Sequence, residues 1–151
     1  MPEQTTLRAA KAGDLAPVQA LLREAKLHLE GLEEQFPQSY VVAESAGALV
    51  GAMGVEVYGK SGLLRSAVVA AKLRGAGLGR QLTENRVAWA KARRLEALYL
   101  LTATAEPFFA RLGFAKTPRA SAPAEVQASL EFSKLCESTA ACMCMRLGLG
   151  T

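Results

Sequence analysis

Residues 72–83 read KLRGAGLGRQLT and contain three glycines at alternate positions, Gly75, Gly77 and Gly79. Glycine has no Cβ, so the backbone can turn sharply there and a ligand can approach its amide groups closely. A helix that begins directly after such a turn adds N–H groups without internal partners and a partial positive charge. These residue types in this pattern predict a binding site for a phosphate group.

The spacing of the glycines decides which phosphate ligand the loop could bind. The dinucleotide fingerprint G-x-G-x-x-G/A fails, because its last position falls on Arg80 or Leu82. The P-loop sequence G-x-x-x-x-G-K-[ST] is absent. What remains is Arg74-x-x-Gly77-x-Gly79. A glycine-rich turn with arginines that cap a helix would give the same letters, and this interpretation stays open.

Arg65 interrupts the apolar run LLRSAVVA of residues 63–70. Burying a guanidinium group without an anion is costly, so Arg65 either faces solvent at a strand edge or contacts a carboxylate. Arginine binds carboxylates through two parallel hydrogen bonds. The second option therefore suits a ligand that carries a carboxylate.

The cysteines, Cys136, Cys142 and Cys144, are odd in number and have no partner C-x-x-C. This pattern favours neither a disulfide framework nor a structural zinc site. On a strand, Cys142 and Cys144 would share one face, with Met143 and Met145 on the other. We expect them to pack as small hydrophobes in a strand buried on both sides, rather than to bind trivalent arsenic. No metal site is expected.

Short strands and helices must position these residues. β-branched and alternating segments predict strands at 5–10, in two arms of a hairpin over 39–59, and at 63–70, 96–104 and 140–147. Apolar periodicity predicts helices at 14–26 with Asp14 as the cap, and at 28–38, 77–94, 106–114 and 124–135. This succession predicts an α/β protein in which helices cover a mixed sheet. The glycines fall at the junction between the strand at 63–70 and the helix at 77–94.

The composition predicts one globular domain over residues 1–151, because half of the residues are hydrophobic and polar low-complexity stretches are absent. No apolar run approaches the roughly 20 residues that span a bilayer, so no membrane association is expected. The N-terminal residues MPEQTTLRAAKAG lack a hydrophobic signal core. We therefore expect a cytoplasmic protein.

The net charge of +4 is concentrated beside the glycines. Residues 72–94 hold seven basic residues and one acidic residue, a net charge of +6, so the rest of the chain sums to −2. Such a local concentration suits a polyanionic cofactor. A nucleic-acid-binding face would spread further and include a reading helix or exposed aromatic residues, so no nucleic-acid partner is expected.

The Arg74-x-x-Gly77-x-Gly79 motif and the order of the elements resemble the GNAT superfamily of acetyltransferases over nearly all of the chain. The stretches LRSAVV (64–69), YLLTATAEPFFARLGF (99–114) and FSKLCESTAACM (132–143) are similar to the small N-acetyltransferases encoded with arsenic-resistance genes. More distantly, they resemble the acetyltransferase domain of N-acetylglutamate synthase. The resemblance implies a central, mostly antiparallel sheet that is splayed between its fourth and fifth strands and flanked by helices.

The resemblance also implies acetyl-CoA as the cosubstrate, bound where the strands at 63–70 and 97–103 separate. Its pantetheine arm would pair with the backbone of Ala67, Val68 and Val69, and an amide near Val68 would polarise the thioester carbonyl. The pyrophosphate would contact the loop residues Arg74, Gly75, Ala76, Gly77, Leu78, Gly79 and Arg80.

Two chemical needs remain, an acid for the leaving thiolate and a base for the amine. Many GNAT enzymes carry a tyrosine as the acid on the helix after the fifth strand, but the matching residue beside the cofactor is Phe109. Water or a hydroxyl such as Ser66 or Thr102 would then supply the proton, or no group would. Glu56, two residues from Tyr58, is the first candidate for the base.

Other interpretations of these carboxylates stay open. Glu56 could be a solvated strand residue, and Glu44 is a weaker candidate base. His28, on a short helix that resembles a surface helix, is expected to be solvated rather than catalytic.

The resemblance implies an acyltransferase that acts on the α-amine of a glutamate-like amino acid, such as the arsenic-bearing mimic arsinothricin. Arg65 would bind the carboxylate of this small-molecule acceptor, and Ser66, Tyr58, Thr102 and Thr104 would line its site. The alternatives are a protein N-acetyltransferase and a sensor that binds acetyl-CoA without turnover. GNAT enzymes are often homodimers, but nothing in this sequence identifies an interface.

Overall fold

The computed structural model describes residues 5–129, 132 and 140–148. The chain divides into two compact units. Unit 1 comprises Met1–Val55 and Arg65–Ala88, and unit 2 comprises Glu56–Leu64 and Trp89–Thr151. Two strands, β3 (Ala48–Tyr58) and β4 (Ser61–Val69), contribute residues to both units.

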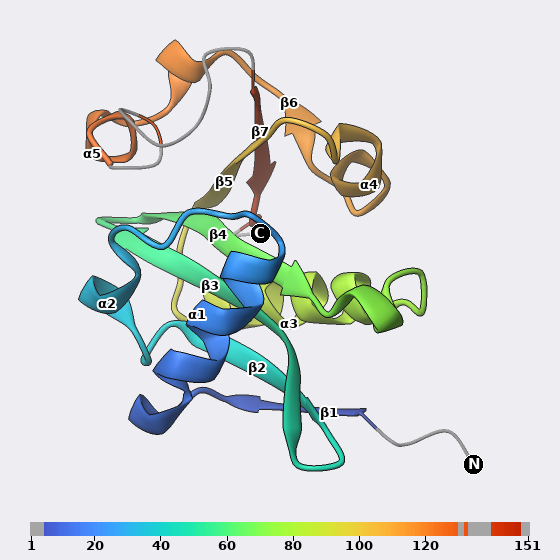
Figure 1. The fold of residues 1–151 in the computed structure, drawn as a ribbon. Coiled ribbons are helices and arrows are strands. Elements are labelled where there is room, and N and C mark those ends of the chain that lie inside the picture. The colour runs from blue at the N-terminus through green and yellow to red at the C-terminus, as the bar shows by residue number, and fades with distance from the viewer. Residues whose placement is uncertain (1–4, 130–131, 133–139, 149–151) are drawn as a thin grey trace. The chain divides into compact units, whose positions relative to one another are not determined.

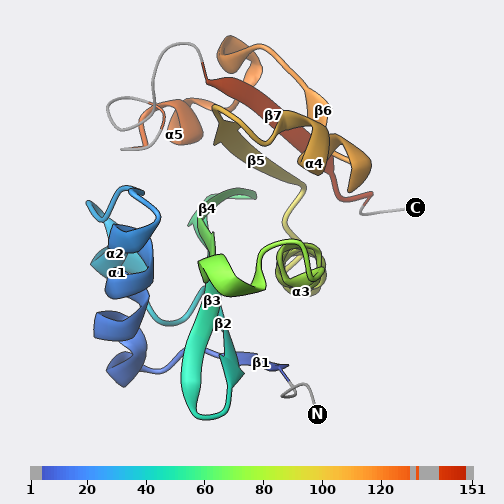
Figure 2. The same ribbon diagram turned by 45° about the vertical axis from the view of Figure 1, so that its right-hand side comes forward.

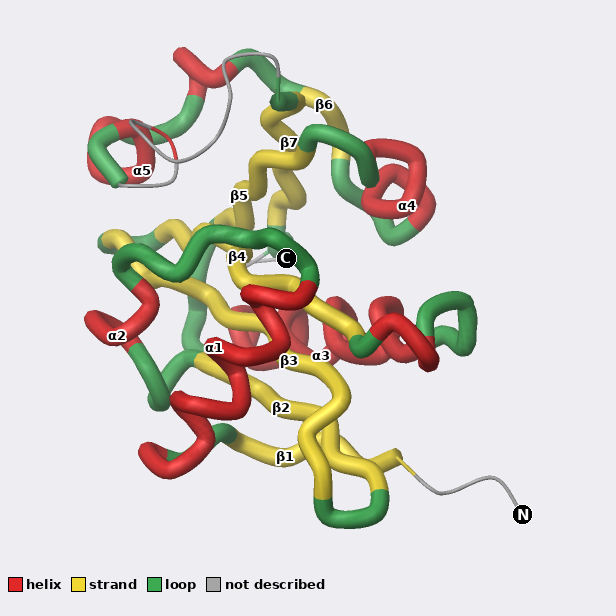
Figure 3. The backbone as a smooth tube through the Cα atoms, in the orientation of Figure 1, coloured by secondary structure: helices red, strands yellow, loops and turns green. Residues whose placement is uncertain are grey.

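Unit 1 contains strands with helices on both sides of them. Its elements are β1 (Thr5–Ala9), η1 (Ala12–Asp14), α1 (Leu15–Glu24), α2 (Leu32–Gln35), β2 (Tyr40–Ser45), parts of β3 and β4, η2 (Ala71–Leu73) and most of α3 (Leu78–Ala92). Helices α1 and α2 lie on one side of these strands and α3 lies on the other (Figure 2). A tight turn at Ala46 and Gly47 joins β2 to β3 (Figure 3), and both residues have positive φ angles, 52° and 80°.

Unit 2 is built around the C-terminal strands. Its elements are the remaining parts of β3 and β4, β5 (Ala97–Thr102), α4 (Glu106–Arg111), β6 (Ala115–Lys116), η3 (Arg119–Ser121), α5 (Ala124–Gln127) and β7 (Ala141–Arg146). Strands β5 and β7 lie side by side (Figure 1) and pair over the full length of both strands.

The strands of the described residues form a seven-stranded sheet in the order β1-β2-β3-β4-β5-β7-β6. Antiparallel pairs join β1 to β2, β2 to β3, β5 to β7 and β6 to β7. The parallel pair is β4 and β5, in which Ser61–Leu63 lie opposite Ala97–Tyr99. Beyond this pairing, β4 continues to Val69 and β5 to Thr102. The expected mixed, mostly antiparallel sheet flanked by helices is confirmed.

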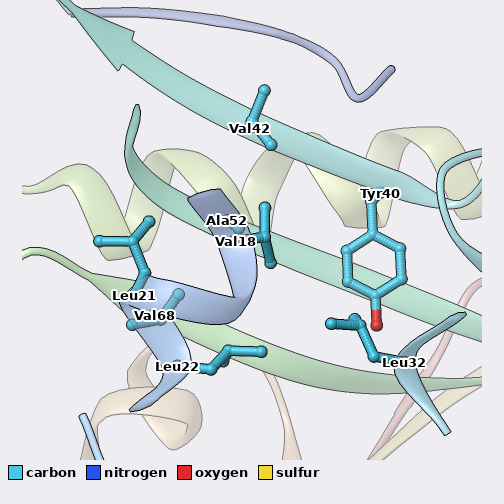
Figure 4. Packing of buried hydrophobic residues seen from close by; sticks show 8 residues of the cluster. All are labelled: Val18, Leu21, Leu22, Leu32, Tyr40, Val42, Ala52 and Val68. Atoms are coloured by element: carbon cyan, nitrogen blue, oxygen red, sulfur yellow. The ribbon is translucent and has the colours of Figure 1, made fainter. Parts of the chain in front are cut away.

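The core of unit 1 lies between α1, α2 and the strands (Figure 4). The apolar face of α1 supplies Val18, Leu21 and Leu22, which recur at helical spacing. They pack with the following residues of α2 and the strands: Leu32, Tyr40, Val42, Ala52 and Val68. Complete burial of one large apolar side chain stabilises the fold by roughly 1.5–3 kcal/mol relative to leaving that side chain exposed.

Unit 2 has a separate cluster of buried side chains. It contains Leu63, Ala97, Tyr99, Ala122, Val126, Phe132 and Cys142. In this cluster, side chains of α5 and β7 pack against side chains of β5 on one face of the sheet. No helix in the described part of the chain is both long and apolar enough to cross a membrane.

Most predicted elements are confirmed. The helix expected over 28–38 is shorter, because α2 spans only Leu32–Gln35, and three further differences are found. The side chain of Asp14 does not cap α1. It accepts hydrogen bonds from the Lys11 N–H and from Arg8, both at 2.8 Å. The hydrogen bond from Arg8 holds the pKa of Asp14 below its ordinary value, against the opposing effect of burial.

The second and third differences lie in unit 2. Strand β6 occupies a stretch for which the sequence indicated no strand range. The helix expected over 124–135 begins as predicted, but α5 ends at Gln127. Residues 130–131 and 133–139, which include Cys136, lie outside the described residues.

Candidate functional site

The glycine loop, residues 74–77, lies between η2 and the start of α3. Gly75 and Gly77 both have φ angles of +87°, a left-handed backbone conformation that residues with a Cβ rarely adopt. A Cβ added at either position would meet no atom of the described chain within 4 Å. The backbone conformation therefore requires glycine, and protein packing does not. The predicted position of the glycines, between a strand and a helix, is confirmed.

The start of α3 is held by packing against β3. Leu78 is 5% exposed. An added Cβ at Gly51 on β3 would lie 3.1 Å from the Val68 carbonyl oxygen and 3.2 Å from Leu82. This close approach anchors the helix on the strand. The Ala76 N–H donates to the Leu73 carbonyl at 3.3 Å, and the Gln81 N–H makes the first bond of the helix, to the Gly77 carbonyl at 3.1 Å. The amides between these two lie at the helix N-terminus, where N–H groups typically bind a ligand.

Two arginines of the predicted phosphate site lie on the exposed surface next to these amides. Arg74 donates from Nε to the Val69 carbonyl at 3.3 Å. Arg80 pairs with Glu84 at 3.0 Å, and both side chains are more than half exposed. Solvent-exposed pairs of this kind contribute little to stability, so Arg80 can exchange this partner for another anion at small cost.

Arg65 is buried, with 4% of its surface exposed. It donates from Nη2 to the Glu30 carbonyl at 2.9 Å and from Nε to Ser66 Oγ at 3.2 Å. The interpretation that Arg65 faces solvent is therefore wrong. The Nε–Nη2 edge, one of the edges that can bind a carboxylate bidentately, is engaged by protein oxygens.

The backbone of β4 changes conformation directly after Arg65. Ser66 has a φ angle of +57°, and its hydroxyl lies 3.2 Å from the Tyr40 hydroxyl. Ala67 is exposed, Val68 is buried and Val69 is half-buried. The structure thus brings Arg65 and Ser66 into direct contact, next to the backbone expected to hold pantetheine. Sequence reasoning did not identify Tyr40.

Glu56 is buried, with 5% exposed, and accepts a hydrogen bond from the Tyr58 hydroxyl at 2.6 Å. The interpretation as a solvated strand carboxylate is therefore wrong. The two residues are two positions apart on β3 and so lie on the same face of the strand, where they form this hydrogen bond. Glu44, the weaker candidate base, pairs with Arg8 at 3.2 Å.

Phe109 lies in an aromatic cluster on α4. It is 8% exposed, and its ring packs edge-on against Phe108 at 5.0 Å and Phe114 at 5.8 Å between centroids. Thr102 Oγ1 accepts a hydrogen bond from the Ala105 N–H at 2.9 Å, just before α4. Thr104 is exposed.

A pocket of about 310 Å³ lies in unit 2 at the ends of β5 and β7. We name it the Thr102 pocket after the residue at the end of β5. Its lining is Thr102, Ala103, Glu106, Lys116, Thr117, Arg119, Ala140, Ala141 and Cys142. Arg119 is held by a hydrogen bond from Nη2 to the Ala140 carbonyl at 3.2 Å. Sequence reasoning included Thr102 but missed Lys116 and Arg119, although the KTPR run after the last predicted short helix was a visible signal.

The C-terminal strand places its thiols as expected for core packing. Cys142 is 2% exposed and Met143 is 1% exposed, while Cys144 is half-buried. Burial raises the pKa of the Cys142 thiol to about 11. Among the described residues, no group of three or more His, Cys, Asp and Glu side chains is arranged to hold a metal ion.

Comparison with known sequences gives two matches. Residues 37–116 match the model of the acetyltransferase (GNAT) domain family. The chain is also 30% identical over 135 residues to YwlB of Bacillus subtilis strain 168, an uncharacterized protein. That alignment covers 87% of this chain and 88% of YwlB.

Solved structures share the fold. N-acetylglutamate synthase from Neisseria gonorrhoeae, complexed with coenzyme A and N-acetyl-glutamate, aligns with a TM-score of 0.83 at 19% identity. The alignment covers 97% of this chain but 36% of that one, so this chain spans about a third of the synthase. The ribosomal-protein-S18-alanine N-acetyltransferase from Escherichia coli aligns with a TM-score of 0.75 at 16% identity, over 98% of this chain and 97% of that one.

Proposed function

The chain belongs to the GNAT acetyltransferase family, and we propose that it transfers the acetyl group of acetyl-CoA to the α-amine of a small, carboxylate-bearing amino acid. Coenzyme A occupies solved structures of the same fold, which supports acetyl-CoA as the cosubstrate. The observation that carries the proposal is the exposed glycine loop directly before α3, in which Gly75 and Gly77 adopt left-handed backbone and are surrounded by open space.

The cofactor would lie along β4 and the glycine loop. The pyrophosphate would accept hydrogen bonds from amides of residues 77–80, with Arg74 and Arg80 neutralising its charge. The pantetheine arm would pair with the backbone of Ala67–Val69. The Val68 amide would donate to the thioester oxygen as negative charge develops on it.

In the reaction, the neutral amine attacks the thioester carbonyl carbon, a C–N bond forms and the C–S bond breaks. The amine loses a proton and the departing CoA thiolate gains one, so protons balance. Glu56 is our candidate to take the amine proton, directly or through water. Its burial and its hydrogen bond from Tyr58 hold the carboxylate in one orientation.

Two groups of cations are candidates for the acceptor's carboxylate. Arg65 was expected in this role, and its engagement with Ser66 and Glu30 leaves it a rigid donor rather than a mobile one. The Thr102 pocket offers Lys116 and Arg119 beside the hydroxyls of Thr102 and Thr117. A glutamate-like acceptor, or its arsenic-bearing mimic arsinothricin, would place a carboxylate at one of these two sites, which belong to different units of the chain.

The direct test is CoA release, measured with a thiol reagent, across a panel of amino acids and amine antibiotics. We expect turnover with an amino acid that carries a second acidic group, and weaker turnover with its amide. Turnover with amine antibiotics alone would overturn the carboxylate-bearing acceptor while leaving the acetyltransferase activity in place.

Single substitutions separate the two cation sites. We expect Arg65→Ala to raise the acceptor KM with little change in acetyl-CoA affinity, and Arg119→Ala to do the same if the Thr102 pocket holds a carboxylate. Arg111→Ala is the matched control, because Arg111 is an exposed arginine at the end of α4 outside the pocket lining. Wild-type acceptor kinetics in Arg65→Ala, with an unchanged melting temperature, would remove the Arg65 clamp.

Phe109 favours a second candidate function, a sensor that binds acetyl-CoA without turnover. Phe109 stands where related enzymes carry an acidic hydroxyl, and its ring is packed among Phe108 and Phe114. The enzyme requires CoA release with at least one amine, and the sensor requires none. In an enzyme without a tyrosine acid, the rate should rise toward alkaline pH without a decline, and Phe109→Tyr should retain the parent's activity or raise it modestly.

A protein N-acetyltransferase is a third candidate. The alignment to the ribosomal-protein-S18-alanine N-acetyltransferase covers almost all of both chains, which keeps this candidate open. It predicts acetylation of a peptide N-terminus in preference to any free amino acid. Mass spectrometry of peptides incubated with acetyl-CoA distinguishes the two acceptor classes.

A further inference from the structure

The side chain of Tyr40 reaches across one strand to a second. Tyr40 on β2 lies opposite Gly54 on β3 in the antiparallel register. Its ring covers Gly54 so closely that a Cβ at that position would overlap the ring. The hydroxyl continues to β4, where it lies 3.2 Å from Ser66 Oγ. Figure 4 shows this hydroxyl at the end of the ring that points away from β2.

Ser66 is the residue at which β4 departs from regular strand geometry. Its φ angle of +57° is left-handed, which is uncommon for a residue with a Cβ. Leu63, Leu64 and Arg65 before it are all buried, whereas Ala67 after it is exposed. The left-handed residue therefore interrupts the regular strand between buried Arg65 and exposed Ala67, and Val68 is buried again.

The Ser66 hydroxyl joins a chain of hydrogen bonds. It accepts from Arg65 Nε at 3.2 Å and bonds the Tyr40 hydroxyl on its other side. Arg65 is in turn fixed by the Glu30 carbonyl. Tyr40 and Arg65 are 1% and 4% exposed, so water competes little for these bonds. A non-glycine residue in a left-handed conformation persists when its surroundings hold it there.

We propose that Tyr40 is a positioning residue whose hydroxyl holds Ser66 in its left-handed conformation and so directs the Ala67 and Val68 amides toward the acetyl donor. The inference rests on the proposed function, because it assigns those amides to the thioester and pantetheine. It predicts that Tyr40 acts on turnover without touching either substrate.

The test uses paired substitutions at Tyr40 and Ser66. Tyr40→Phe removes the hydroxyl and keeps the ring, and we expect kcat to fall on the order of tenfold, because small displacements of aligned groups slow a reaction strongly. We expect kcat to fall to a similar extent in Ser66→Ala. Ser66→Gly also loses the hydroxyl, but glycine adopts a φ of +57° without strain, so we expect it to be faster than Ser66→Ala.

The double variant Tyr40→Phe/Ser66→Gly is the decisive arm. A backbone-positioning role predicts that it is faster than Tyr40→Phe alone, because glycine no longer needs the tyrosine to hold it. Tyr99→Phe is the matched control, since Tyr99 is a similarly buried tyrosine on β5, 3% exposed. We expect wild-type kcat in that variant.

Two results would overturn the proposal. Wild-type kcat in Tyr40→Phe would show that the Tyr40 hydroxyl does not position Ser66. Equal losses in Ser66→Ala and Ser66→Gly, without rescue in the double variant, would show that the Ser66 hydroxyl itself acts on the substrate.

A readout without turnover separates this proposal from the proposed function. Backbone chemical shifts of Ser66, Ala67 and Val68 in the free protein report the left-handed conformation. We expect them to move in Tyr40→Phe and to return in the double variant, even if no amine releases CoA. Unchanged shifts in Tyr40→Phe would overturn the positioning role independently of activity, whereas failure of every amine would overturn the proposed function alone.

Discussion

Gly54 and Gly77 both lie in unit 1 and both must lack a side chain, for opposite reasons. At Gly54 the space of a Cβ is filled by the Tyr40 ring, so the protein itself requires glycine. At Gly77 that space is empty of described protein atoms, and the constraint is the φ angle of +87°. Gly54 makes room for a neighbouring side chain, whereas Gly77 leaves the backbone of the loop accessible to a ligand. Stability and cofactor affinity should therefore respond separately to substitution at the two positions.

Gly54→Ala should give the largest effect on stability. The added Cβ would overlap a ring that is 1% exposed and cannot move aside freely. Overpacking of this kind lowers the free energy of unfolding by about 1–3 kcal/mol. Denaturant unfolding measures it, with Gly13→Ala as the control, because a Cβ at Gly13 meets no described atom within 4 Å. Equal stability in the two variants would show that the ring is not fixed over Gly54.

Gly77→Val should give the largest effect on cofactor binding. The side chain enters the space that the pyrophosphate would occupy, and we expect acetyl-CoA affinity to fall about tenfold, or about 1.4 kcal/mol. Calorimetric titration of the folded protein measures this loss.

Gly47→Val separates ligand contact from backbone strain in the Gly77 experiment. Gly47 has a φ angle of +80° and an equally open surrounding, but it lies in the turn between β2 and β3. Both valines strain the backbone, so both should lower stability, and only Gly77→Val should lower affinity. Equal affinity losses would show that the glycine loop is not the phosphate site.

The smallest expected effects come from the exposed pair of Arg80 and Glu84. Arg80→Ala should lower acetyl-CoA affinity a few-fold, because one cation near the phosphates is lost. Glu84→Gln should leave affinity unchanged or raise it, because the competing carboxylate is gone. Both should change stability by less than about 0.5 kcal/mol. Added salt should shrink the difference between the variants, and equal affinities at low salt would remove Arg80 from the site.

The contrast between the two glycines also explains what the sequence could predict. Gly75, Gly77 and Gly79 are clustered between an apolar strand and a periodic helix, so local spacing alone indicates a loop for a ligand. Gly54 stands alone within a strand, and its purpose is visible only from the register that places Tyr40 opposite it. Sequence separation hides such a pair, because no periodicity connects residues on different strands.

The candidate site follows the same division. The types and spacing of Glu56, Tyr58 and Arg65 could be read along the chain. Their environments could not, because burial depends on the layers that cover each strand. Solvation was an open interpretation for Glu56 and Arg65, and both are buried and hydrogen-bonded. The Thr102 pocket was missed because Lys116 on β6 and Arg119 in η3 line it together with residues of β5 and β7 that are distant in the sequence.

The buried thiol of Cys142 has a consequence for the protein's own chemical integrity. An acetyltransferase works in the presence of a reactive thioester, which can pass its acetyl group to a protein thiolate as the CoA thiolate leaves. Because burial raises its pKa to about 11, Cys142 carries much less thiolate at neutral pH than an ordinary cysteine would. Self-acetylation should therefore be slow at this residue. Iodoacetamide labelling of Cys142 should be slow near pH 8 and accelerate as the pH approaches 11 or when the protein unfolds.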